Sequence, residues 1–285
     1  MFEYGVACSL EKDVPALWPI PLRGPVEYLA ETAREIGYTG IELQLRDPER
    51  YNWHSLADAA AKMDVVYTAI ATGRENVENG HLLISEDPAV RRAAIEKLKL
   101  HIDLGQALNC MVVVGTVRGN VPDFARYSLF EGYLIEAMHE LSEYALRKGV
   151  SLVVENITAN ISNWLNTIKQ VKDFIDKLSL PNVGVHLDTY SMLMEDTDIG
   201  GAVNYCGDAL RYVHYSDSGR MYPGGGNVNF KSFTRALYRS KYKGYVVVES
   251  RPYPNEYICA KRGYEYMKAI ETCVAIEEAE DTLKR

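Results

Sequence analysis

Apolar residues along this chain fall into short unbroken runs, and longer segments with helical periodicity separate them. The runs are rich in β-branched residues and do not alternate with polar positions. This pattern is typical of parallel strands covered by helices. Eight strands are expected on this basis, at residues 2–8, 41–45, 65–71, 111–117, 152–157, 183–188, 212–215 and 245–249.

The segments between these runs carry recognisable helix boundaries. Pro25 opens one apolar-periodic segment and Gly37 follows its last residue, which are favoured places for proline and glycine at the two ends of a helix. Asp87 precedes another such segment as a capping residue, and Gly149 ends a third. The expected helices are 25–36, 87–102, 131–148, 162–178, 229–242 and 257–276.

The order of these elements predicts the fold class. Strands and helices alternate without interruption, which favours a (β/α)8 TIM barrel forming a single domain over residues 1–285. A Rossmann-like open sheet is the second choice, but no G-x-G-x-x-G motif follows any expected strand. The chain also has the length that one such barrel typically needs, about 250 residues.

Composition and charge exclude several classes of function. A net charge of −8 argues against nucleic acid as a partner, because binding phosphates requires a basic face. There is no apolar run of about 18 residues, so no membrane span is expected. The five cysteines form no C-x-x-C pair, and no basic segment precedes the first apolar run. A cytoplasmic location is therefore the expectation.

The last four expected strands each end on a residue that can bind a metal ion: Glu155, Asp188, His214 and Glu249. One carboxylate after a strand usually caps a helix or joins a salt bridge, but four strands in succession favour a metal site. In a barrel these strand ends face one mouth, where their side chains can converge. Oxygen ligands with one imidazole suit a divalent ion. Manganese is expected, with magnesium, cobalt and zinc as alternatives.

The spacing of these residues carries a family resemblance. Asp188 follows Glu155 by 33 residues, His214 follows Asp188 by 26, and Glu249 follows His214 by 35. This resembles the ketose 3-epimerase branch of the xylose-isomerase-like TIM barrels. Other segments are similar to a keto-sugar-acid subgroup that includes 5-keto-L-gluconate epimerase: Glu42, Arg46-Asp47-Pro48, Thr72-Gly73, the helix after Asp87, and residues 115–119.

The resemblance implies a metal-dependent epimerase or isomerase that acts on a small keto-sugar or keto-sugar acid. The metal would polarise the substrate carbonyl, and Glu155 and Glu249 would exchange a proton on the neighbouring carbon. Arg220 would hold a substrate oxygen. The resemblance also implies a homodimer or homotetramer.

Two positions depart from the family pattern. Ser191 stands where the family usually has a histidine that binds substrate, and Ile161 stands where it commonly has a glutamate. We therefore expect substrate recognition to differ from that of ordinary ketohexose epimerases, with enolisation retained. A metal-dependent lyase or dehydratase for keto-inositols or keto-C-glycosides is the alternative function. A nuclease or a non-catalytic sugar-binding barrel fits the ligand set and charge less well.

Further candidates for substrate binding lie just after the expected strands. Five arginines follow different expected strands at the same mouth. They either bind an anionic substrate or form ion pairs with Asp47, Asp217 and Glu75. His81 is expected in a loop near the mouth, His186 in the core beside the site, and His101 and His139 on helix surfaces. The arginines are Arg46, Arg74, Arg118, Arg220 and Arg251.

Overall fold

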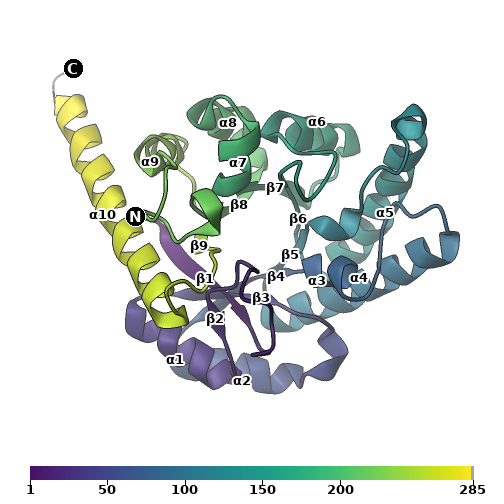
Figure 1. Ribbon diagram of the computed structural model, residues 1–285, viewed down its shortest axis with the longest axis horizontal. Coiled ribbons are helices and arrows are strands. Elements are labelled where there is room, and N and C mark those ends of the chain that lie inside the picture. Colours follow the sequence, from purple (N-terminus) through teal and green to yellow (C-terminus); the bar gives the residue numbers. More distant parts are fainter. Residues whose placement is uncertain (284–285) are drawn as a thin grey trace.

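The computed structural model describes residues 1–283, and within them eight parallel strands close into a barrel (Figure 1). Each strand pairs with its neighbour in the sequence, and the last strand closes the ring by pairing with the first. The two-residue strand β2 (Leu22–Arg23) pairs with the end of β1. The barrel strands are β1 Glu3–Ser9, β3 Gly40–Gln44, β4 Val66–Ala71, β5 Met111–Val114, β6 Leu152–Glu155, β7 Val183–Asp188, β8 Leu210–Tyr215 and β9 Tyr245–Val248. The predicted TIM-barrel fold is confirmed.

Helices surround the barrel on its outside (Figure 1). Two short helices, α3 (Gly73–Val77) and α7 (Thr189–Glu195), instead follow directly after β4 and β7 at the carboxyl ends of the strands. The remaining helices are α1 Val26–Ile36, α2 Trp53–Met63, α4 Pro88–Leu108, α5 Tyr127–Lys148, α6 Ile168–Leu178, α8 Ile199–Cys206, α9 Phe230–Arg239 and α10 Glu256–Leu283. None of the helices in residues 1–283 combines the length and apolar character needed to cross a membrane.

Local signals in the sequence explain most helix boundaries. Gly37 and Gly149 take left-handed conformations at the ends of α1 and α5, and the Asp87 side chain accepts a hydrogen bond from Ala89 N at the start of α4. The expected helix 162–178 begins only at Ile168, because Thr167 and Gln170 form a capping box there. Helices α2, α3, α7 and α8 were not predicted, although Asn52 caps α2 by accepting from two backbone N–H groups.

The barrel interior is packed below the strand ends. A small cluster of inward-facing side chains fills it, and the hydroxyl of Tyr212 lies 2.7 Å from the hydroxyl of Thr68 across the barrel. Open space inside the barrel therefore lies above this cluster, at the carboxyl ends of the strands, where TIM-barrel sites form. The cluster consists of Ala7, Ala69, Val113, Val153, Tyr212 and Val247.

Candidate active site

The four predicted metal ligands meet at the carboxyl ends of four adjacent strands. Glu155 ends β6, Asp188 ends β7, His214 lies near the end of β8, and Glu249 follows β9 directly. The register places Asp188 opposite His214 on the paired strands. One potential ligand atom from each of the four residues lies within 4.8 Å of the others. Residues up to 94 positions apart in the sequence are therefore brought into one cluster.

His214 is held with one ring nitrogen turned toward the cluster. Its Nε2 donates to Oε2 of Glu42 on β3 at 2.6 Å. Its Nδ1 is buried without a hydrogen-bond partner among the described residues and lies 3.6 Å from Oε2 of Glu249 and 3.9 Å from Oδ2 of Asp188. Burial alone would lower the pKa of His214, but Glu42 and Glu249 raise it well above its usual value.

The carboxylate of Glu249 is held by neighbouring donors. Gln44 Nε2 donates to its Oε1 at 2.9 Å, and Arg220 Nη1 donates to its Oε2 at 2.6 Å. The same Arg220 nitrogen donates to Oδ2 of Asp188 at 2.6 Å. Burial would raise the pKa of Glu249, but Arg220 and His214 outweigh it and lower that pKa to about 2. Glu249 is therefore ionised at neutral pH.

Glu155 lies in a different electrostatic environment within the same cluster. Burial, followed by the charges of Glu249 and Asp188, raises the pKa of Glu155 to about 8. Gly115 on the neighbouring chain segment allows this carboxylate to approach closely, because a Cβ there would lie 2.8 Å from Glu155 Oε2. In the chain without a cation, Glu155 mainly carries a proton at pH 7.

The donor set fits a divalent metal ion. Three carboxylates and one imidazole converge, and the buried Nδ1 of His214 has no partner in the described part of the chain. The contact with Glu42 sets the ring orientation, as hydrogen bonds from a histidine's other nitrogen do in metal sites. A bound cation would also offset the burial and the carboxylate repulsion that raise the pKa of Glu155. Glu155, Asp188, His214 and Glu249 are thus suited to hold such an ion.

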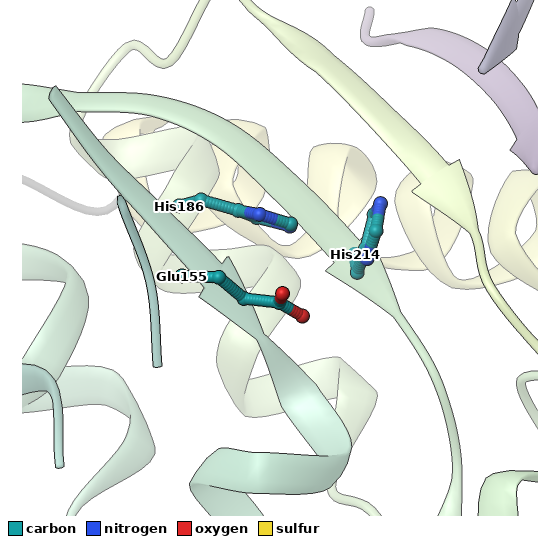
Figure 2. Close-up of side chains that lie close together, drawn as sticks. All are labelled: Glu155, His186 and His214. Carbon is teal, nitrogen blue, oxygen red and sulfur yellow. The ribbon is translucent and has the colours of Figure 1, made fainter. Parts of the chain in front are cut away.

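His186 lies beside these residues, as expected, and is completely buried (Figure 2). Its ring meets the His214 ring edge to face with centroids 4.2 Å apart, and neither of its nitrogens has a hydrogen-bond partner within residues 1–283. One of these nitrogens also falls within 4.8 Å of ligand atoms of Glu155 and His214. Burial, followed by the charges of His214 and Arg220, lowers the pKa of His186 well below its usual value, so the ring is neutral.

Two residues of the site were missed when its members were predicted from the strand ends. Glu42 enters the sequence analysis only through the family resemblance, and Gln44 is not marked there as a site residue. Both lie on β3, and both are buried. The available signal was a carboxylate and an amide at alternate positions of an apolar strand, which places both side chains on one face.

The structure separates the predicted substrate-binding residues into two groups. Arg220 and Arg74 line a cavity of about 200 Å³ in front of the cluster. Arg118, Ser191 and His81 lie outside the set of described residues that line it.

Arg118 instead binds the protein's own backbone. Its side chain is fully buried and donates to the carbonyl oxygens of Glu155 at 2.9 Å and of Trp164 and Leu165 at 3.2 Å each. Burial lowers the pKa of Arg118 to about 10, so it remains charged at neutral pH. Arg118 therefore holds the segment after β6 in place.

Ser191 and His81 also make contacts within the protein itself. The backbone N–H of Ser191 donates to Oδ1 of Asp188 at 2.7 Å, so the helix α7 that begins there orients that carboxylate. His81 Nδ1 lies 2.7 Å from Oε2 of the buried Glu75. His101, expected on a helix surface, is fully buried and lies 2.9 Å from the other oxygen of Glu75. That expectation was wrong because α4 turns this residue toward α3.

Three of the five arginines at the mouth are paired with carboxylates, but not with the expected ones. Arg74 pairs with Glu11 and Glu78, and Arg46 pairs with Glu78 at 2.9 Å. Arg220 pairs with Asp188 and Glu249, as described above. These three cations are balanced by acidic groups of the chain itself.

Comparison with known proteins places this arrangement in a family. The model of the family described as "Xylose isomerase-like TIM barrel" matches residues 30–271. The chain belongs to this family. It is 30% identical over 227 residues to a ketose 3-epimerase of Arthrobacter globiformis, covering 79% of this chain and 77% of the relative. It is 32% identical over 222 residues to an L-ribulose 3-epimerase of Methylomonas sp. (strain DH-1), covering 76% of each chain.

Solved structures agree with this family membership. A crystal structure of D-allulose 3-epimerase from Methylomonas sp. in complex with D-allulose superposes with a TM-score of 0.80 at 25% identity, covering 94% of this chain and 96% of that one. These family relatives are sugar epimerases, which supports an epimerase or isomerase activity for the present family member.

Proposed function

We propose that this protein is a divalent-metal-dependent epimerase of a keto-sugar or keto-sugar acid. The observation that supports this most strongly is the convergence of Glu155, Asp188, His214 and Glu249 within 4.8 Å at the barrel mouth. These four residues would hold the metal, with manganese as the expected ion. The metal, when bound, supplies a positive charge that acidifies the carbon-bound proton next to a substrate carbonyl.

Glu155 and Glu249 are the proposed acid and base. Glu155 ends β6 and Glu249 follows β9, and two strands separate β6 from β9 in the ring, so the two carboxylates approach the cavity from different directions. One would remove a proton from carbon on one face, and the other would return a proton to the opposite face. The pKa of about 8 for Glu155 and of about 2 for Glu249 supports one group that starts protonated and one that starts ionised.

Arg220 is the proposed substrate-orienting cation. Its guanidinium lines the cavity, and one nitrogen bridges Asp188 and Glu249. Other N–H groups of the same guanidinium remain to bind a substrate oxygen, since arginine carries five donors. Arg74, although it lines the cavity, is paired with Glu11 and Glu78 and would shape the wall.

Proton exchange in heavy water tests this function directly. The protein would be incubated with manganese and a panel of ketoses and keto-sugar acids, and deuterium uptake next to the carbonyl would be followed by NMR. We expect chelator-sensitive uptake and a product epimeric at that carbon. Chelator-sensitive uptake followed by loss of water or of an aglycone would instead identify the alternative lyase or dehydratase. Epimer formation that persists in chelator would contradict the metal-dependent mechanism.

A further inference from the structure

The cavity in front of the acidic cluster has two chemically different ends. Its inner end is formed by ionisable and amide side chains, among them Glu155, Glu249 and Arg220. Its outer walls are apolar and are formed by Trp18, Pro19, Val77, Ile157 and Ile161. A molecule that reaches the acidic cluster with one part therefore places another part against apolar side chains.

The apolar wall continues from the interior to the surface. Ile157 is buried at 3% exposure, whereas Ile161 is 51% exposed and Val77 is 61% exposed. Single exposed apolar residues are common on proteins, but their gathering around the mouth of a cavity is typical of a ligand-binding surface. The exposed surfaces of Ile161 and Val77 make apolar contacts only when a bound molecule covers them.

The polar groups along the same walls already have partners within the protein. The Thr72 hydroxyl donates to Val113 O at 2.7 Å, and the Thr116 hydroxyl donates to Gly73 O at 3.1 Å. The Arg74 guanidinium is paired with two carboxylates. The chain of hydroxyls in an open ketose would find few free donors on this side, and unpaired buried hydroxyls weaken binding.

Trp18 is the aromatic side chain of this wall. The guanidinium of Arg74 lies 5.7 Å from the centroid of its ring, a cation–π contact that anchors the indole at the cavity. Aromatic rings pair favourably with other rings in stacked or edge-on arrangements. Across the cavity lining, Ile161 adds an exposed apolar side chain where the family pattern led us to expect a glutamate.

We propose that the substrate is a keto-sugar joined to an aromatic aglycone. The sugar part would lie at the acidic cluster, and the aromatic ring would lie against Trp18, Val77 and Ile161. This inference rests on the proposed function, because the sugar part undergoes the same proton exchange and the aglycone contributes only binding. Such a substrate differs from a free ketose because its aromatic part needs the apolar wall for binding.

Kinetics with two matched glycosides test the role of the aglycone. Phenyl and methyl 3-keto-glucosides share a ring ketone flanked by C–H groups and differ in their aglycone. With manganese-loaded protein, we expect deuterium exchange into the phenyl compound to have a kcat/KM at least tenfold higher than into the methyl compound. D-Fructose serves as the free ketose, for which we expect a lower kcat/KM than for the phenyl compound.

A pair of isoleucine variants tests the wall itself. Ile161→Gln should raise KM for the phenyl compound and bring the phenyl-to-methyl ratio close to one. Ile276→Gln is the matched control, because Ile276 is 56% exposed on α10 and lies outside the cavity lining. We expect its ratio to stay at the wild-type value.

Binding without turnover separates this inference from the proposed function. Calorimetry on metal-free protein with the non-keto phenyl and methyl glucosides should show at least tenfold tighter binding of the phenyl compound. Equal binding of the two, or equal kcat/KM, overturns the aromatic aglycone even if all keto compounds exchange deuterium. Tighter phenyl binding with no exchange from any probe supports the aglycone site and overturns the epimerase.

The same variants also test a different occupant of the wall. If the two glucosides bind equally and Ile161→Gln changes the sedimentation coefficient while Ile276→Gln does not, the rim packs against a second copy of the chain. That outcome overturns the proposal. An unchanged sedimentation coefficient together with a phenyl preference supports it.

Discussion

Glu155 and Glu249 are the same residue type at the same end of one barrel, yet the protein holds them in opposite ways. Glu249 is held through its carboxylate, which accepts hydrogen bonds from Gln44 and Arg220. Glu155 is held through its backbone, because Arg118 donates to its carbonyl oxygen. The pKa of Glu249 is lowered to about 2, and that of Glu155 is raised to about 8.

This difference shows that protonation is assigned by the neighbours of each carboxylate. Glu249 is buried and Glu155 is partly buried, and burial by itself would raise both pKa values. Glu249 accepts a hydrogen bond from the cation Arg220, so its charged form is stabilised more strongly than that of Glu155. A barrel that presents two equivalent strand ends thus offers one proton donor and one proton acceptor.

The strongest test removes the two carboxylates one at a time. Glu155→Gln and Glu249→Gln preserve size but cannot exchange a proton, so each should lower kcat for deuterium exchange by about 10²–10⁴-fold. Glu140→Gln on α5 is the control and should keep wild-type activity, since Glu140 pairs with Arg92 and Lys99 on the outside. Activity retained in both site variants, with unchanged melting temperatures, would rule out the acid–base pair.

The backbone support of Glu155 can be tested through stability. Arg118→Leu removes a buried donor from three carbonyl oxygens, so we expect the free energy of unfolding to fall by about 2–4 kcal/mol. Arg92→Leu on the surface should lower it by less than about 1 kcal/mol. Urea denaturation followed by circular dichroism measures both, and equal effects would show that Arg118 is not a structural support.

The side-chain support of Glu249 can be removed separately. Arg220→Gln eliminates the cation that contacts Glu249 and Asp188, so the pKa of Glu249 should rise and kcat/KM should fall by about 10–100-fold. Carboxyl NMR of the metal-free protein reports the pKa directly. Arg239→Gln on α9 is the control, and an unshifted Glu249 in Arg220→Gln would assign the low pKa to other groups.

Metal binding should reduce the difference in protonation between the carboxylates of Glu155 and Glu249. A metal ion binds the ionised form of Glu155, whose pKa is raised to about 8 by burial and by nearby carboxylates. Raising the pH from 6 to 8 therefore removes a competing proton, and manganese affinity should increase by up to about tenfold per pH unit, with a smaller slope above pH 8. Calorimetry in two buffers of different ionisation enthalpy would measure proton release. No released proton at pH 6 would contradict the protonated state of Glu155.

Much of this molecule was predictable from local patterns. Continuous apolar runs identify parallel strands because both their faces are buried, and the residues Glu155, Asp188, His214 and Glu249 stand out because each interrupts such a run at its end. Helix limits followed where a capping residue or glycine marked them, as at Asp87 and Gly37. Helix α2 was not predicted, although Asn52 marks its start as a capping residue.

The sequence by itself determined the order of strands, and therefore that the four ligand candidates share one mouth, because parallel neighbours in a barrel all point the same way. Only the tertiary structure decided which charges touch. The side chains of Arg118 and His81 contact backbone carbonyls and Glu75, and the backbone N–H of Ser191 donates to Asp188. Glu42 and Gln44 lie on β3, far away in the sequence, and orient His214 and Glu249. Such contacts depend on side-chain direction and burial, which arise only when distant strands close into a ring.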